Sequence, residues 1–126
     1  MNSNILFTST INDYLVLDQT GAYLNTLADN FCLSSFDLLQ EISKTLENDK
    51  HDIWLSHMHT LKGAAGIAGA KNLHDICDKL RSRNKNDFID SKKYIMRVLC
   101  DAIDEYQDAV HQKLNTITHI KNETRL

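Results

Sequence analysis

Hydrophobic residues recur every three or four positions along most of the chain, the spacing that places side chains on one face of an α-helix. Five segments carry this pattern. They cover about residues 10–31, with a division near Gly21, then 34–48, 49–68, the stretch from 71 to the polar run 82–87, and a last stretch from Asp87 or Asp90 to Lys113. The pattern predicts an all-α fold, an antiparallel up-and-down four-helix bundle with an additional short N-terminal helix.

Local signals suggest where these helices begin and end. Ser34 followed by Asp37 is an acidic variant of a capping box, so a helix is predicted to begin there, and Asp49 can cap the next one. The first of these helices carries one apolar stripe, formed by Phe36, Leu39, Ile42 and Leu46. Gly69 and Ala70 predict a short turn, which forces the helices on either side of it to lie antiparallel and adjacent.

Length and composition favour one domain. The chain has 126 residues, 42% of them hydrophobic, with no proline and four glycines, so folds that need many tight turns are disfavoured. We expect a single domain over residues 1–126, with a core over about 17–113 and a frayed tail over 115–126.

Charge and cysteine usage narrow the function. A formal charge of -3 argues against a dedicated nucleic-acid binder. The three cysteines are widely spaced and form no Cys-x-x-Cys pair, which disfavours a disulfide framework or a zinc module. There is no apolar run long enough for a membrane span and no signal-peptide pattern at the N-terminus, so we expect a cytoplasmic protein without membrane insertion.

The informative stretch is residues 54–70, which a helix sorts onto two faces at 100° per residue. The buried face carries Trp54, Met58, Leu61, Ala65 and Ala68. The opposite face carries Leu55, His59, Lys62, Gly63 and Gly66. A glycine inside a helix is about 1 kcal/mol less favourable than alanine, so two of them suggest a purpose other than stability. They would leave a flat strip on which another protein can approach His59, with Leu55 as an apolar docking contact.

The run His59-Thr60-Leu61-Lys62-Gly63-Ala64-Ala65, followed by Gly69-Ala70 and Leu73, resembles the signature of histidine-containing phosphotransfer (HPt) domains. The resemblance covers about residues 17–112 and is strongest over 52–80. It implies a four-helix bundle whose exposed histidine, here His59, accepts a phosphoryl group from the aspartate of a response-regulator receiver domain and passes it to another receiver.

The chemistry of the residues agrees with this resemblance. Neutral imidazole is a good nucleophile near neutral pH, and the ammonium of Lys62 would stabilise the charge of the incoming phosphoryl group. We expect no metal site and no cofactor in this chain, and we expect magnesium in the partner receiver domain. His57 and His59 cannot share one ion, because residues two apart point to different sides of a helix. Many family members carry glutamine or glutamate, which can orient the imidazole, where this chain has Arg81. Arg81 is a candidate phosphate or orienting contact: either another group or water holds the ring here, or Arg81 adds a second positive charge for the phosphate, and we favour the second.

The chain shows no nucleotide-binding motif, so we expect a phosphocarrier without kinase or ATPase activity. Receiver domains and a hybrid sensor histidine kinase are the expected partners, and a monomer suits a carrier that visits several of them. Two alternatives stay open. The protein could be a helical adaptor that binds receiver domains or other signalling proteins without being phosphorylated, or the phosphoacceptor domain of a larger hybrid kinase.

Overall fold

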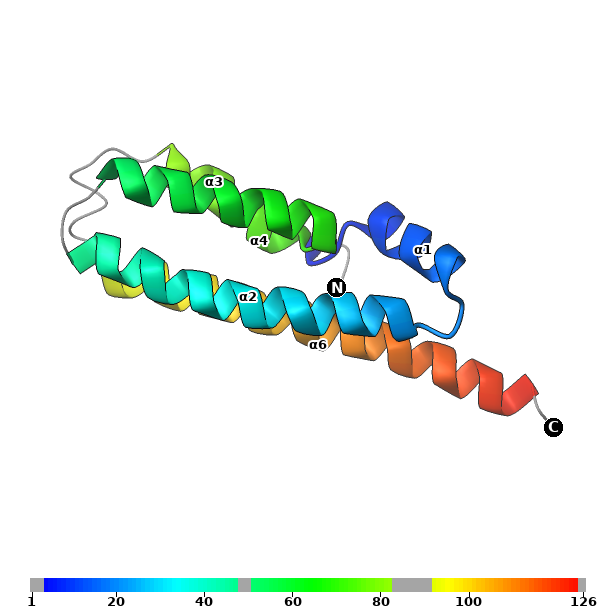
Figure 1. Ribbon diagram of the computed structural model, residues 1–126. Helices are drawn as coiled ribbons and strands as arrows, with labels where there is room; N and C mark the ends of the chain where they lie inside the picture. Colours follow the sequence, from blue (N-terminus) through cyan, green and yellow to red (C-terminus); the bar gives the residue numbers. More distant parts are fainter. Residues whose placement is uncertain (1–3, 48–50, 83–91, 125–126) are drawn as a thin grey trace.

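The structure is a computed structural model that describes residues 4–47, 51–82 and 92–124. This part of the chain contains five helices: α1 (Thr8–Leu17), α2 (Ala22–Glu47), α3 (His51–Ala68), α4 (Lys71–Arg81) and α6 (Lys92–Thr124). Helices α2, α3, α4 and α6 form the bundle, and α1 packs at one end against α2 and α3 (Figure 1). The predicted all-α class is confirmed. None of the described helices combines the length and the apolar character that crossing a membrane requires.

The buried face predicted for α3 lies in the core of the bundle. Trp54, Met58 and Leu61 are at most 1% exposed, and so are Ala65 and Ala68. Opposite them, Tyr106 of α6 is buried, and its hydroxyl donates a hydrogen bond of 2.7 Å to the carbonyl oxygen of Ala68. This burial fixes the rotation of α3 about its axis, and therefore fixes which of its residues face outward.

Helix α2 differs from the prediction, because it is one continuous helix with Ser34 in its interior. The capping signal at Ser34 is overridden by an unbroken buried stripe that runs through Cys32, Ser35 and Leu39. Burying this stripe along the whole bundle stabilises the protein more than a new N-cap at Ser34 would. Phe36, which we expected in this stripe, is 38% exposed, and Ser35 occupies the buried position instead.

The predicted division at Gly21 is confirmed. Gly21 has a φ of +82°, and a Cβ there would lie 2.5 Å from the side chain of Leu114, so only glycine fits this turn. The carboxylate of Asp18 accepts hydrogen bonds from the backbone N–H groups of Thr20 and Tyr23, at 3.0 and 3.1 Å. These bonds satisfy backbone donors at the start of α2.

The turn predicted at Gly69 and Ala70 is also confirmed. Gly69 has a φ of +79°, the Ala70 N–H donates to the Ala65 carbonyl at 2.8 Å, and the Gly69 N–H donates to the Gly66 carbonyl at 3.2 Å. This is a Schellman motif, which closes the C-terminus of α3. The N-terminal segment crosses the turn, where the Phe7 N–H donates to the Gly69 carbonyl at 2.8 Å. The turn therefore holds α3 and α4 antiparallel at a fixed register.

The chain ends differ from the prediction in part. Helix α6 was expected to end near Lys113 with a frayed tail, but it continues to Thr124. The predicted capping residues Asp49, Asp87 and Asp90 lie outside the described residues.

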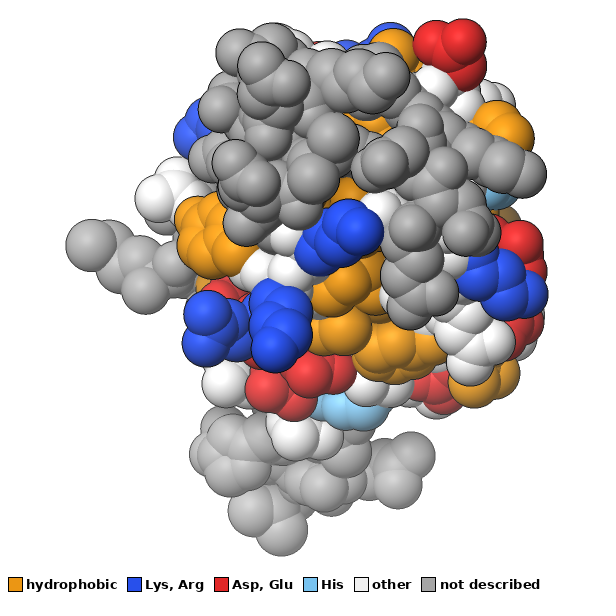
Figure 2. Space-filling model, turned by 90° about the vertical axis from the view of Figure 1, so that its left-hand side faces the viewer, with side chains coloured by type: hydrophobic (Ala, Val, Ile, Leu, Met, Phe, Trp, Pro, Cys, Tyr) orange, Lys and Arg blue, Asp and Glu red, His pale blue; other side chains and the backbone are white. Residues whose placement is uncertain are grey.

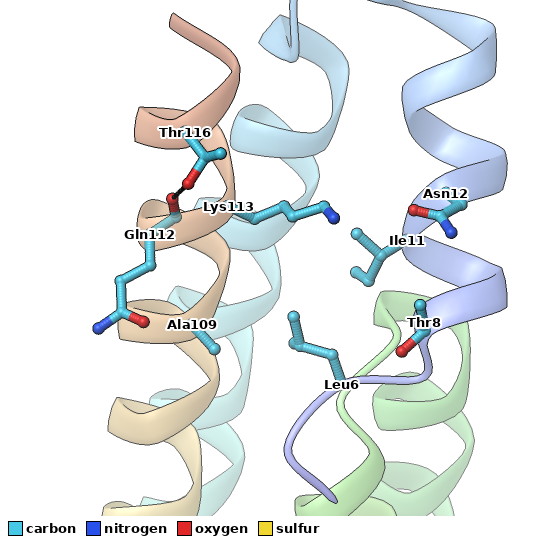
Figure 3. A pocket seen from close by; sticks show the side chains of 8 residues that line it. All are labelled: Leu6, Thr8, Ile11, Asn12, Ala109, Gln112, Lys113 and Thr116. Atoms are coloured by element: carbon cyan, nitrogen blue, oxygen red, sulfur yellow. Dashed lines mark hydrogen bonds between the residues drawn. The ribbon is translucent and has the colours of Figure 1, made fainter. Parts of the chain in front are cut away.

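A cavity of about 410 Å³ lies between α6 and the N-terminal part of the chain that includes α1 (Figure 3). Its lining consists of Leu6, Thr8, Ile11, Asn12, Ala109, Gln112, Lys113 and Thr116.

Candidate functional site

His59 lies on the outer face of α3 with its side chain exposed. The residues immediately before it and two positions after it, Met58 and Leu61, are fully buried, so the packing of the helix holds the imidazole outward. The exposure predicted from helical spacing is therefore observed. A nucleophile in this position can be reached by a partner without any opening of the bundle.

The glycines beside His59 leave the surface of α3 open. A Cβ added to Gly63 would meet no atom within 4 Å, and one added to Gly66 would meet only the His74 ring at 3.8 Å. Neither glycine has a positive φ, so neither is needed for the backbone conformation. We call His59, Gly63 and Gly66 the glycine strip. Its openness is a property of the surface and serves no contact within the fold.

An apolar groove of about 250 Å³ runs along one side of the glycine strip, between α2 and α3. Its lining from α2 is Leu27, Asn30, Phe31 and Ser34, and its lining from α3 is Ala64, Ile67 and Ala68. Ile67 is 66% exposed, so a large apolar side chain lies open to solvent at the edge of this groove. Sequence analysis did not single out Ile67, although it lies on α3 one turn beyond Gly63.

Lys62 lies on the other side of the glycine strip, where it faces α4. Its ammonium donates a hydrogen bond of 2.7 Å to Oδ1 of Asp78, and the two groups form an ion pair that joins α3 to α4. The Lys62 side chain is 27% exposed. The lysine predicted to serve the phosphoryl group therefore has a carboxylate partner that sequence analysis missed.

The register of α3 against α4 follows from their antiparallel arrangement about Ala70. Lys62 and Asp78 lie at equal distances from Ala70 and form the ion pair between the helices. His59 and Arg81 also lie at equal distances from Ala70, so they stand at the same level of the two helices. The same rule would have identified Asp78 from the sequence, because Asp78 and Lys62 each lie eight residues from Ala70.

The side chain of Arg81 has a buried hydrogen-bond donor without a partner among the described residues. The side chain is partly buried, and this donor is its Nε atom. An unpaired buried donor on a charged group is costly, and it is satisfied when an acceptor binds nearby. The guanidinium carries only donors and cannot accept the Nδ1 proton of the histidine. Arg81 therefore offers hydrogen-bond donors, and no acceptor, to the groups around it.

The charges of this cluster influence one another. The hydrogen bond from Lys62 and the positive charges of Lys62 and Arg81 lower the pKa of Asp78 below its ordinary value, so this carboxylate is ionised at neutral pH. Burial raises the pKa of the Cys77 thiol to about 12, against the opposing effect of the positive charges of Lys62 and Arg81. Lys62, Asp78 and Arg81 thus form one cluster along the α3–α4 interface.

Leu55 is less exposed than expected. It is partly buried and packs against the core, because the face of α3 that it shares with Lys62 turns toward α4.

Within residues 4–47, 51–82 and 92–124, no three side chains of His, Cys, Asp or Glu are grouped as a metal site. In the end view of Figure 2, described lysine and arginine side chains lie beside acidic ones. The cavity in Figure 3 includes none of the predicted site residues.

The fold and the site define a helical bundle that presents one exposed histidine on an open helix face. The model of the Hpt domain family matches residues 26–117, which is most of the chain. The protein therefore belongs to the Hpt domain family, as the resemblance in the sequence predicted. Hpt domains are phosphocarriers of two-component phosphorelays and are not kinases. No curated protein and no solved structure gives a significant match to the chain.

Proposed function

We propose that this protein is a phosphorelay intermediate that accepts a phosphoryl group on His59 from the aspartyl phosphate of one receiver domain and transfers it to another. The observation that carries this proposal is the exposed imidazole beside Gly63, where an added Cβ would meet nothing within 4 Å. The gap left by Gly63 does not stabilise the helix. It does allow a partner to bring a phosphorylated aspartate within bonding distance of His59.

The reaction is a transfer between two nucleophiles. The lone pair on Nε2 of neutral His59 attacks phosphorus, the P–N bond forms, and the P–O bond to the receiver carboxylate breaks as that carboxylate leaves. Nδ1 carries the ring proton during the attack and releases it to water afterwards. In the reverse sense, a carboxylate of the next receiver attacks phosphorus and the imidazole leaves, taking up a proton at Nδ1.

Lys62 and Arg81 supply the positive charge on this side of the reaction. Both lie on the α3–α4 side of the glycine strip, and both carry N–H donors that can bind phosphoryl oxygens. Further positive charge near the phosphoryl group would come from a magnesium ion held by the receiver domain. The active site is then shared, with the nucleophile and two cations on this chain and the acidic residues on the partner.

The groove between α2 and α3 provides the docking surface for this partner. Ile67, Leu27 and Ala64 line it, and it opens directly beside the glycine strip. An exposed apolar surface next to a reactive group is typical of a site that a partner covers transiently. A receiver that docks in this groove would bring its aspartate over Gly63 toward His59.

The proposal is tested by incubating the purified protein with a panel of labelled, phosphorylated receiver domains. The wild-type chain is expected to take up label that is lost in acid and retained in alkali, as a phosphoramidate should be. His59→Gln is expected to take up none. His57→Gln is the matched control, since His57 lies two residues away on the same helix but on a different face.

Two results contradict the proposal. Label on His59→Gln equal to that on the wild-type chain would show that another residue is phosphorylated. A wild-type chain that binds receivers without taking label from any of them would support the non-phosphorylated adaptor. Circular dichroism of all three proteins checks that the variants are folded.

A further inference from the structure

The ion pair between Lys62 and Asp78 lies where a phosphoryl group on His59 would need the lysine. The ammonium of Lys62 is 2.7 Å from Oδ1 of Asp78, and Lys62 precedes Gly63 at the edge of the glycine strip. Asp78 belongs to α4, so the pair draws the lysine side chain toward the α3–α4 interface. In the unphosphorylated protein, the ammonium of Lys62 is thus paired with a carboxylate.

Asp78 also lies next to the second cation of the site. It precedes Arg81 by three residues on α4, the separation at which two side chains share one face of a helix. Asp78 therefore contacts Lys62 across the α3–α4 interface and has Arg81 one turn further along its own helix. A phosphoryl group that arrives at His59 therefore meets two positive charges and one negative charge.

We propose that Asp78 is a positioning residue that competes with the phosphoryl group for the ammonium of Lys62 and thereby keeps phosphorylated His59 high in transfer potential. This inference rests on the proposed function. The ammonium can make a full ion pair with the carboxylate or with the phosphoryl oxygens, and the carboxylate repels the dianionic group. A carrier must release what it accepts. Without Asp78, Lys62 and Arg81 would hold the phosphoryl group more tightly and slow its departure.

A second ion pair on the same helix provides a matched control. Asp75 accepts a hydrogen bond from the ammonium of Lys71 at 2.9 Å, and both of these side chains are partly exposed, at 43% and 37%. The pair joins residues of α4 alone and does not involve Lys62. Asp75→Asn therefore removes the same charge as Asp78→Asn, together with contacts to Lys71 and to Nδ1 of His74 at 3.2 Å that all lie within α4, while Lys62 keeps its partner.

The test measures how label distributes at equilibrium between a phosphorylated receiver and the full chain. Asp78→Asn is expected to shift the distribution toward His59 by about two- to fivefold, which is the modest effect that an exposed ion pair has on an equilibrium. Asp75→Asn is expected to leave it unchanged. In a Lys62→Met chain, adding Asp78→Asn is expected to change the distribution less, because the competition for the Lys62 ammonium is then absent and only direct repulsion by the carboxylate remains.

The shift should also shrink as salt is added, since it is electrostatic, whereas a purely structural effect would not. Any of three results overturns the inference: no shift or a shift toward the receiver in Asp78→Asn, an equal shift in Asp75→Asn, or an undiminished shift in the Lys62→Met background. Failure of the proposed function is seen separately, because a wild-type chain that takes no label has no distribution to shift.

Discussion

Gly63 allows the stability of the fold and the access to the site to be separated by substitution at one position. Gly63 lies inside α3, has no positive φ, and would place a Cβ in open space. Replacing glycine by alanine inside a helix stabilises it by up to about 1 kcal/mol. Gly63→Ala is therefore expected to raise the free energy of unfolding by about 0.5–1 kcal/mol, or the melting temperature by about 2–5 °C. Urea and thermal denaturation followed by circular dichroism measure this change.

A larger side chain at position 63 should reduce the access of a partner to His59. The side chain of Gly63→Leu would stand on the glycine strip, one turn from the imidazole, while leaving the core untouched. A displacement of about 1 Å between reacting groups can slow a reaction about 100-fold, so we expect the rate constant for transfer from a saturating phosphorylated receiver to fall by one to two orders of magnitude. Rapid-quench measurement of a single turnover gives this rate constant.

The control for Gly63→Leu is Asp101→Leu, which adds the same side chain to an exposed position on α6. It is expected to leave the transfer rate within about twofold, because surface substitutions away from a site have small effects. An unchanged transfer rate in Gly63→Leu would refute the steric role of the glycine strip. A loss of stability in Gly63→Ala would refute the conclusion that the glycine serves no contact within the fold.

Two further predictions concern the fold. Gly69→Ala should lower the free energy of unfolding by about 1–3 kcal/mol, because its φ is +79° and its Cβ would lie 2.8 Å from Ile11, while Gly66→Ala, with its nearest atom at 3.8 Å, should not destabilise; equal urea midpoints would contradict this. Burial raises the pKa of Cys32 to about 11 and of Cys77 to about 12, from 9.0. Since both folded values lie above the unfolded value, their stabilisation is complete below about pH 9 and is lost as the pH rises toward 12, so urea denaturation should show a free energy of unfolding about 1–3 kcal/mol lower at pH 10 than at pH 8. A constant value would show that the thiols ionise freely in the folded chain.

The sequence by itself determined the helical class and the exposure of the histidine. Both depend on periodicity within one segment: the spacing of Trp54, Met58 and Leu61 commits one side of α3 to the core, so the side that carries His59 must face outward. The turn at Gly69 was equally readable, because a left-handed backbone at a helix C-terminus favours glycine. These features depend on neighbours within about two helical turns.

The continuity of α2 through Ser34 was decided by the tertiary structure alone. A local capping signal and a long apolar stripe compete there, and packing along the entire bundle settles the outcome in favour of the stripe. The length of α6 beyond Lys113 likewise departed from what its apolar pattern indicated.

The partners of the site residues were also decided only by the assembled bundle. The pairing of Lys62 with Asp78 depends on the register of two helices that approach each other across a turn. Periodicity assigns each of these side chains to a face of its own helix. It does not identify the residue of the neighbouring helix that this side chain contacts. That choice is made when the turn at Gly69 sets how far α4 is displaced along α3, because a small displacement would bring different charges together.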